Sequence, residues 1–206
     1  PLPLLPARIS SEQKITPNCF PDNNEYSTGL RIVLAAGMDG TSGQRILAFL
    51  RQLNQSQAAS QLILEVVCGK NSQLQQRVLK LSALLKNIRI HTHGLVSDLP
   101  VLLRRADLAV LRAGPQSISE SLVAGTPVIA FDWHIHERGN MQLLVERKCG
   151  WGSKEPKQIV DKIEALCQDS ALLNRWKRAA ARLGADLPGD SFAESLLGDL
   201  HITSSR

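Results

Sequence analysis

A glycine turn followed by hydroxyl side chains and one carboxylate is the part of this chain best suited to bind a ligand. Residues 112–117 read RAGPQS, and Glu120 lies about one turn further on, in a helix that we expect to begin at Gln116. A helix N-terminus offers unpaired N–H groups and the positive end of the helix dipole, so it attracts phosphate. Gly114 lets the backbone approach an anion closely. These residue types favour a phosphate site at the turn.

Glu120 suits a different part of a nucleotide. A carboxylate at this position would repel phosphate, but it could accept two hydrogen bonds from a ribose diol. The hydroxyls of Ser117 and Ser119 are expected to donate hydrogen bonds to the ligand. The alternative is a Gly-Pro turn with serine caps and an acidic residue favoured by the helix dipole. Local chemistry alone leaves both interpretations open.

Two apolar runs flank this turn, and they predict the elements that position it. Residues 108–111 and 128–131 read as strands, so the order is strand, turn, short helix, strand, with the helix ended by Gly125 and Pro127. Ligands of parallel sheets bind beyond the carboxyl ends of the strands, where residues 112–117 would lie. Further strands are expected at 30–36, 61–68, 88–91 and within 149–152, and further helices at 44–53, 72–86, 99–105, 141–148, 156–168 and 171–183. The pattern predicts an α/β, Rossmann-like domain whose parallel sheet has about six strands.

A second glycine-rich turn follows the first expected strand. It contains Gly37, Met38, Asp39, Gly40 and Thr41. Such a strand-to-helix turn can hold a pyrophosphate, although neither a P-loop nor a strict GxGxxG is present. The acidic residue is unfavourable beside a diphosphate unless its carboxylate points away.

The stretch RAGPQSISESLVAGTP, residues 112–127, is similar to the nucleotide-sugar signature of one branch of the two-domain (GT-B) glycosyltransferases. That branch includes the peptidoglycan lipid-intermediate GlcNAc transferase and the monogalactosyldiacylglycerol synthases. Glu137 and Asn140, in HERGN, match the residues that bracket the donor sugar in this family, and VVCGKN at 66–71 resembles the galactolipid-synthase branch. The spacing is kept across the whole block.

The resemblance implies the donor-binding half of an inverting, metal-independent enzyme that transfers a hexosyl group from a UDP-sugar to an acceptor hydroxyl. It assigns the phosphates to Gly37, Met38, Asp39, Gly40, Thr41, Arg112, Gly114, Pro115, Gln116 and Ser117. It assigns the ribose to Glu120, the uracil to Leu95 and Val96, and the donor sugar to Glu137 and Asn140. No catalytic residue is expected in this half, because the family's general base belongs to the other half. No cofactor is expected.

The composition is that of a soluble globular protein. Of 206 residues, 43% are hydrophobic and 21% are charged, and the net charge of +5 would suit a diphosphate or an anionic membrane surface. Aromatic content of 4% argues against stacking on nucleic acid, so no nucleic-acid partner is expected. Neither the four cysteines nor the pair His91 and His93 shows ligand spacing, so we expect reduced thiols and no metal site. We expect a cytoplasmic protein and leave open peripheral association with the inner face of the membrane.

The expected organisation has two parts. Residues 1–29 have the composition of a linker or of the tail of a preceding domain, and residues 30–206 would form the nucleotide-sugar-binding domain, ending in an amphipathic stretch at 188–200. The implied partner is an acceptor-binding N-terminal domain or a separate subunit. Two alternatives remain: a UDP-sugar hydrolase or 2-epimerase of the same fold, and a non-catalytic donor-binding subunit of a split transferase. A dinucleotide dehydrogenase is disfavoured, because Cys68, Gly69 and Lys70 end the second strand where an acidic residue would be required.

Overall fold

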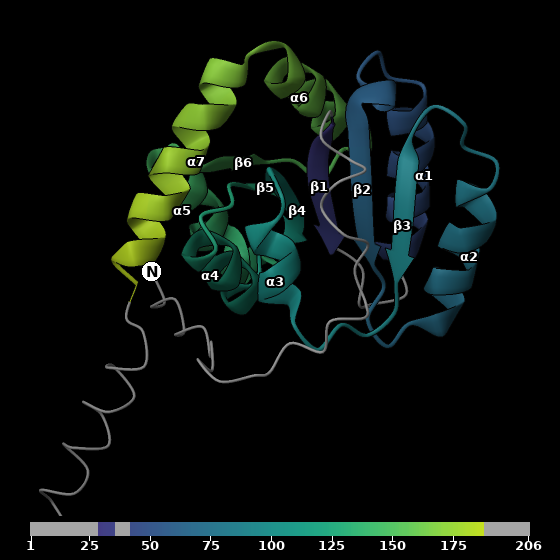
Figure 1. The fold of residues 1–206 in the computed structure, drawn as a ribbon. Helices are drawn as coiled ribbons and strands as arrows, with labels where there is room; N and C mark the ends of the chain where they lie inside the picture. Colours follow the sequence, from purple (N-terminus) through teal and green to yellow (C-terminus); the bar gives the residue numbers. More distant parts are fainter. Residues whose placement is uncertain (1–28, 36–41, 188–206) are drawn as a thin grey trace, which may run out of the picture.

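The structure is a computed structural model that describes residues 29–35 and 42–187 (Figure 1). The strands are β1 (Leu30–Ala35), β2 (Leu62–Val67), β3 (Arg89–His93), β4 (Leu108–Arg112), β5 (Val128–Asp132) and β6 (Gly150–Gly152). The helices are α1 (Ser42–Asn54), α2 (Ser72–Ser82), α3 (Leu99–Arg104), α4 (Pro115–Val123), α5 (Arg138–Glu146), α6 (Pro156–Gln168) and α7 (Ser170–Ala185), with 3₁₀ turns η2 (Ala59–Gln61) and η3 (Ile135–Glu137). The predictions for residues 1–28, for Gly37 to Thr41 and for 188–200 lie outside the described residues.

The strands form one six-stranded sheet in the order β3-β2-β1-β4-β5-β6, and every neighbouring pair is parallel. The predicted α/β fold is therefore confirmed. The strand order reverses between β1 and β4, which is the switch point where ligands of such sheets bind. All carboxyl ends meet at one edge, so the exits of β1, β4 and β5 lie next to one another there.

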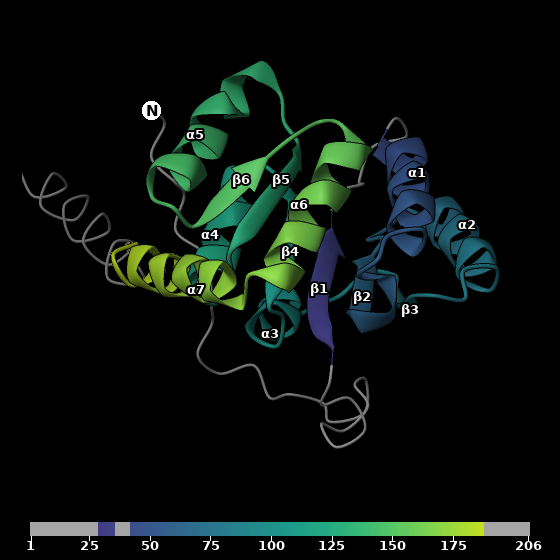
Figure 2. The same ribbon diagram turned by 90° about the horizontal axis from the view of Figure 1, so that it is seen from above.

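Helices cover both faces of the sheet (Figure 2). Alternate strand residues supply the two cores, because successive side chains of a strand point to opposite faces. Ile32 and Leu34 of β1 pack in the core beneath α1, α2 and α6, whereas Val33 packs in the core beneath α3, α4 and α5. Helix α7 contributes to both: Trp176 lies in the first core and Ala180 in the second.

Two glycines fix how α4 ends and how closely it packs. Gly125 has a φ of 74°, a left-handed conformation that ends a helix at little cost in glycine. Gly184 of α7 lies against the backbone of α4, because a Cβ at this position would stand 2.0 Å from the carbonyl oxygen of Leu122. Any larger residue at position 184 would have to push the two helices apart.

Several element boundaries differ from the prediction. Helix α2 ends at Ser82 instead of Lys86, and β3 runs to His93, two residues beyond its predicted end. Helix α5 begins at Arg138 instead of Met141, because η3, whose N-terminus is capped by the carboxylate of Glu137, runs directly into it. In the part of the chain described, no helix is both long enough and apolar enough to cross a membrane.

Candidate functional site

The N-terminus of α4 lies at the switch-point edge and has no side-chain cap. Gly114 is the N-cap residue and Pro115 opens the helix, which is nine residues long. By contrast, the first turns of α2, α3 and α7 are capped by the side chains of Asn71, Asp98 and Asp169. The α4 amides can therefore bind an external acceptor, and the sequence placed this turn correctly at the strand exit.

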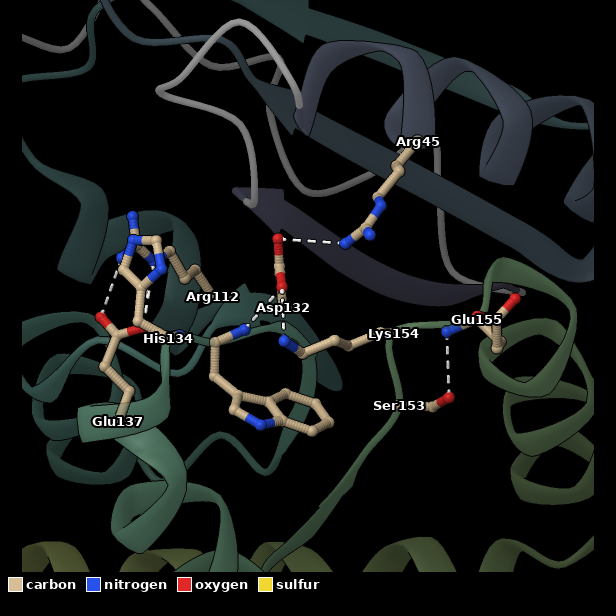
Figure 3. A network of polar contacts seen from close by, with 9 residues as sticks. Arg45, Arg112, Asp132, His134, Glu137, Ser153, Lys154 and Glu155 are labelled. Atoms are coloured by element: carbon tan, nitrogen blue, oxygen red, sulfur yellow. Dashed lines mark hydrogen bonds and ion pairs between the residues drawn. The ribbon is translucent and has the colours of Figure 1, made fainter.

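A buried ion pair supports the turn from behind (Figure 3). The guanidinium of Arg112 binds the carboxylate of Glu137 through Nε–Oε2 and Nη2–Oε1 contacts, both of 3.2 Å. Burial alone would raise the pKa of the Glu137 carboxyl, but the backbone N–H of His134 (2.7 Å) and Arg112 outweigh it and lower that pKa. Glu137 is only 5% exposed, and its Oε1 would lie 3.7 Å from a Cβ at Gly114.

Asn140 holds the same turn from the first residues of α5. Its Nδ2 donates to the carbonyl oxygen of Ala113 at 3.0 Å. The structure thus brings Glu137 and Asn140, both predicted to bind the donor sugar, directly to the phosphate turn. In the described structure their polar atoms bind protein groups, and contact with a sugar remains a prediction.

The remaining residues of α4 divide between core and surface. Glu120 is half-buried on the accessible side, where its Oε1 accepts a hydrogen bond from Nε2 of Gln116 at 2.9 Å. Ser117 is also half-buried. Ser119, which was expected to donate to the ligand, is instead buried at 1% exposure. That expectation was wrong, because Ser119 lies on the buried side of α4 with Ile118 and Leu122.

The predicted uracil-binding pair lies at the exit of β3. Leu95 is 68% exposed, and Val96 packs at the margin of the second core. The neighbouring exit of β2 is joined to this turn, since Gly69 N donates to the oxygen of Gly94 at 3.1 Å. An exposed leucine at this edge leaves an apolar surface for a ligand, and its role remains a prediction.

A pocket of about 270 Å³ opens beside the α4 turn, and the sequence had not predicted it. It is lined by Arg45, Asp132, Trp133, His134 and Lys154. Asp132 lies at its centre: Oδ2 is 3.2 Å from Nη1 of Arg45, and Oδ1 is 3.7 Å from Nζ of Lys154 (Figure 3). The signal available in the sequence was position: Asp132 ends β5, Lys154 follows β6 by two residues, and Arg45 lies in the first turn of α1.

A second charged network crosses the other half of the sheet. Glu65 of β2, 4% exposed, lies 2.5 Å from Nη1 of Arg31 on β1 and 2.7 Å from Nε2 of His93 on β3. The sequence spacing gave no sign of this partner for His93, because Glu65 comes from the neighbouring strand. Among the residues described, no three His, Cys, Asp or Glu side chains form a group that could hold a metal ion.

A family model described as "Glycosyl transferases group 1" matches residues 44–183. Monogalactosyldiacylglycerol synthase 1 of Arabidopsis thaliana is 33% identical over 107 residues, which is 52% of this chain and 19% of the relative. The processive diacylglycerol beta-glucosyltransferase of Bacillus cereus (strain AH820) is 25% identical over 201 residues, which is 96% of this chain and 50% of the relative.

Solved structures of other proteins share this fold. MurG of Acinetobacter baumannii superposes with a TM-score of 0.62 at 19% identity, covering 77% of this chain and 46% of MurG. This chain therefore spans half or less of the length of these relatives.

Proposed function

Because this chain belongs to the group 1 glycosyl transferases, we propose that it is the donor-binding half of an enzyme that transfers a hexosyl group from a UDP-sugar to an acceptor hydroxyl. The lipid glycosyltransferases among its relatives support this class of reaction. Their greater length supports an acceptor-binding half, either on the same polypeptide or as a separate subunit.

The observation that carries the proposal is the uncapped N-terminus of α4. A diphosphate placed there would receive hydrogen bonds from the first-turn N–H groups and the favourable end of the helix dipole. Asn140 donates to the carbonyl oxygen of Ala113, and the pair of Arg112 and Glu137 joins the end of β4 to the start of α5. These contacts would restrict the turn before a ligand arrives. Preorganised donors stabilise a departing anion more effectively than donors that must first reorient.

The nucleoside would extend from this turn toward β3. Glu120, one helical turn from Gln116 on the accessible side of α4, would accept the ribose hydroxyls. Leu95 and Val96 would pack on the uracil, and the segment Gly37 to Thr41 would complete the phosphate site. The sugar would lie near Glu137 and Asn140, at the start of α5.

The proposed mechanism is a single displacement that inverts the anomeric carbon without a metal ion. A base in the acceptor-binding half removes the proton from the acceptor hydroxyl, while this half stabilises the departing UDP with N–H groups and cations. The chain on its own should bind the nucleotide and transfer little or no sugar. The names of its relatives refer to diacylglycerol lipids, which supports a reaction at a membrane surface. The cytoplasmic side of that membrane stays a prediction from the sequence.

Calorimetric titration of this chain with UDP and with ADP tests the proposal. We expect UDP to bind and ADP to bind more weakly; equal or tighter binding of ADP would rule out the uridine site. Glu120→Ala should weaken UDP by about 1.5–3 kcal/mol, the scale of a hydrogen bond to a charged group. Glu146→Ala, which removes an exposed carboxylate from α5, is the matched control and should leave UDP affinity unchanged.

A non-catalytic donor-binding subunit of a split transferase is a second candidate, because the described residues would bind the nucleotide in the same way in such a subunit. Such a subunit would bind UDP with the same residues and gain activity only when joined to an acceptor-binding partner. Release of free sugar from a UDP-sugar by this chain alone would instead indicate a hydrolase.

A further inference from the structure

The turn proposed to pack on the uracil follows β3, the outermost strand on one side of the sheet (Figure 1). Leu95 in this turn is 68% exposed, so the core does not fix its position. The backbone is joined to β2 at the two residues before it. The oxygen of His93 accepts a hydrogen bond from Cys68 N at 2.9 Å. That of Gly94 accepts one from Gly69 N at 3.1 Å. Whatever holds His93 therefore also fixes where the turn begins.

The side chain of His93 is held by a buried carboxylate on the neighbouring strand. Its Nε2 lies 2.7 Å from Oε2 of Glu65, which is only 4% exposed. The parallel register sets Glu65 opposite His91, two residues before His93, so both histidines lie on the same face of the sheet as Glu65. On the other side of Glu65, Nη1 of Arg31 lies 2.5 Å from Oε1. Glu65 thus ties together three adjacent strands, β1, β2 and β3.

The charge of Glu65 determines the direction of its hydrogen bond with His93. Burial alone would raise the pKa of the Glu65 carboxyl, but His93, His91 and Arg31 outweigh it and lower that pKa. Glu65 is therefore a carboxylate at neutral pH, and a carboxylate only accepts hydrogen bonds. The shared proton must belong to Nε2 of His93. A hydrogen bond to an ionised acceptor is stronger than a neutral one, so it restricts the imidazole ring more firmly.

Stability alone does not require a carboxylate at this position. Ile63, the neighbour of Glu65 on the same face of β2, is apolar and 1% exposed. Apolar residues of similar volume often replace buried ion pairs without loss of stability, whereas a buried charged network can restrict a structure to one geometry. Such a restriction has its nearest consequence at Gly94, directly after His93.

We propose that His93 and Glu65 are positioning residues: the bond between them fixes the turn that packs on the uracil and thereby favours uridine over adenosine nucleotides. This inference rests on the proposed function and adds two residues that act through the turn without touching the ligand. If the bond is lost, β3 keeps its backbone pairing with β2, but the ring of His93 no longer anchors the end of the strand. Leu95 and Val96 then take up a wider range of positions, and ordering them costs binding energy. The α4 turn has separate supports and should be unaffected.

Calorimetric titration of the full chain with UDP and with ADP tests this role. Wild type should bind UDP more tightly than ADP. His93→Leu, which removes the donor, should weaken UDP about three- to tenfold, the scale of one hydrogen bond, and leave ADP within about twofold. Glu65→Gln, which removes the charge of the acceptor, should act in the same direction. His93→Gln retains an N–H group that can donate to Glu65 and should keep UDP affinity within about twofold of wild type.

Asp107→Asn is the matched control for the loss of a charged contact in the sheet. Asp107 lies directly before β4, at the opposite edge, where it accepts a hydrogen bond from Arg31 N at 2.8 Å and contacts Nζ of Lys177. Its variant should be less stable than wild type, with an unchanged ratio of UDP to ADP affinity. Thermal unfolding identifies the variants that are folded during titration. The His93 side chain is 22% exposed, so its variants carry the test even if Glu65→Gln does not fold.

The outcomes separate the two proposals. If wild type does not prefer UDP to ADP, the proposed uridine site fails. If wild type prefers UDP and His93→Leu keeps that preference, the positioning role is overturned while the uridine site stands. Equal weakening of UDP and ADP by His93→Leu would also overturn it, since a general loss of structure affects both nucleotides. So would a loss in His93→Gln as large as in His93→Leu, because the bond to Glu65 would then not matter.

Discussion

Two charged groups lie side by side at the carboxyl edge, and they are built differently. Arg112 and Glu137 form a buried pair whose carboxylate receives two guanidinium contacts and a backbone N–H. Arg45, Asp132 and Lys154 form an open cluster with contacts of 3.2 and 3.7 Å, in which both the cations and the carboxylate are more exposed than those of the first pair. The buried pair fixes the backbone that would meet the diphosphate, whereas the open cluster keeps donors available. Arg112 is therefore held firmly by its partner, whereas Arg45 keeps hydrogen-bond donors available.

The largest expected effect comes from breaking the buried pair. Glu137→Gln removes the charge that Arg112 faces, while keeping the shape of the side chain. We expect the free energy of unfolding to fall by about 2–3 kcal/mol, below the range for fully buried pairs because Arg112 is about a third exposed. Urea denaturation measures it. If the free energy of unfolding falls no further in Glu137→Gln than in Asp132→Asn, the Arg112–Glu137 pair does not support the fold more than the Arg45–Asp132–Lys154 cluster does.

Acid should weaken the same pair. The pKa of the Glu137 carboxyl is lowered in the folded protein, so its contribution to stability is present above the unfolded pKa, about 4.3. That contribution is lost as the pH falls through the lower, folded pKa. The stability difference between wild type and Glu137→Gln should therefore shrink from about pH 7 to about pH 3. A difference that stays constant would show that the charge of Glu137 does not matter. Glu65, whose pKa is also lowered, titrates in both proteins and cancels from the difference.

A smaller effect is expected at Asn140. Asn140→Ala removes the hydrogen bond to the oxygen of Ala113 and should cost about 1 kcal/mol of stability. It should also weaken UDP, because the turn loses one of its supports. Asn174→Ala, on the exposed surface of α7, is the control for both measurements. Full UDP affinity in Asn140→Ala would limit the supporting role to Arg112 and Glu137.

The smallest effect is expected in the open cluster. Asp132→Asn should change the free energy of unfolding by less than about 1 kcal/mol, and the change should decrease further in high salt, because exposed ion pairs are screened. Urea denaturation at two salt concentrations measures both. A loss as large as that of Glu137→Gln would indicate that the cluster supports the fold and is not kept for a ligand.

Much of the fold was predictable because the strands are continuous apolar runs and the turns are marked by glycine and proline. Gly125 and Pro127 correctly predicted the end of α4. The predicted membership of the glycosyltransferases is confirmed by the family match, and the predicted fold is confirmed by the structure and its solved neighbours. The end of α4 and the family could both be predicted because each depends on residues that are close together in the sequence.

Contacts between strands were not predictable in the same way. Glu65 reads as one polar residue in an apolar run, and its partners Arg31 and His93 lie on strands far away in sequence. Only the strand register places His93 beside Glu65, and only the sheet order brings α1 close to Asp132. The direction in which a helical side chain points was also missed at Ser119, where an error of one residue in helical phase exchanges core for surface.

The close contact at Gly184 links a distant part of the chain to nucleotide binding. Helix α7 presses on the end of α4, so a methyl group at position 184 would lever α4 as a rigid rod and tilt its opposite end at Gly114. The amide groups there would then point away from the proposed phosphate position. A residue far from the proposed ligand would in this way affect its affinity, because the missing side chain of Gly184 lets the backbone of α4 lie close to α7.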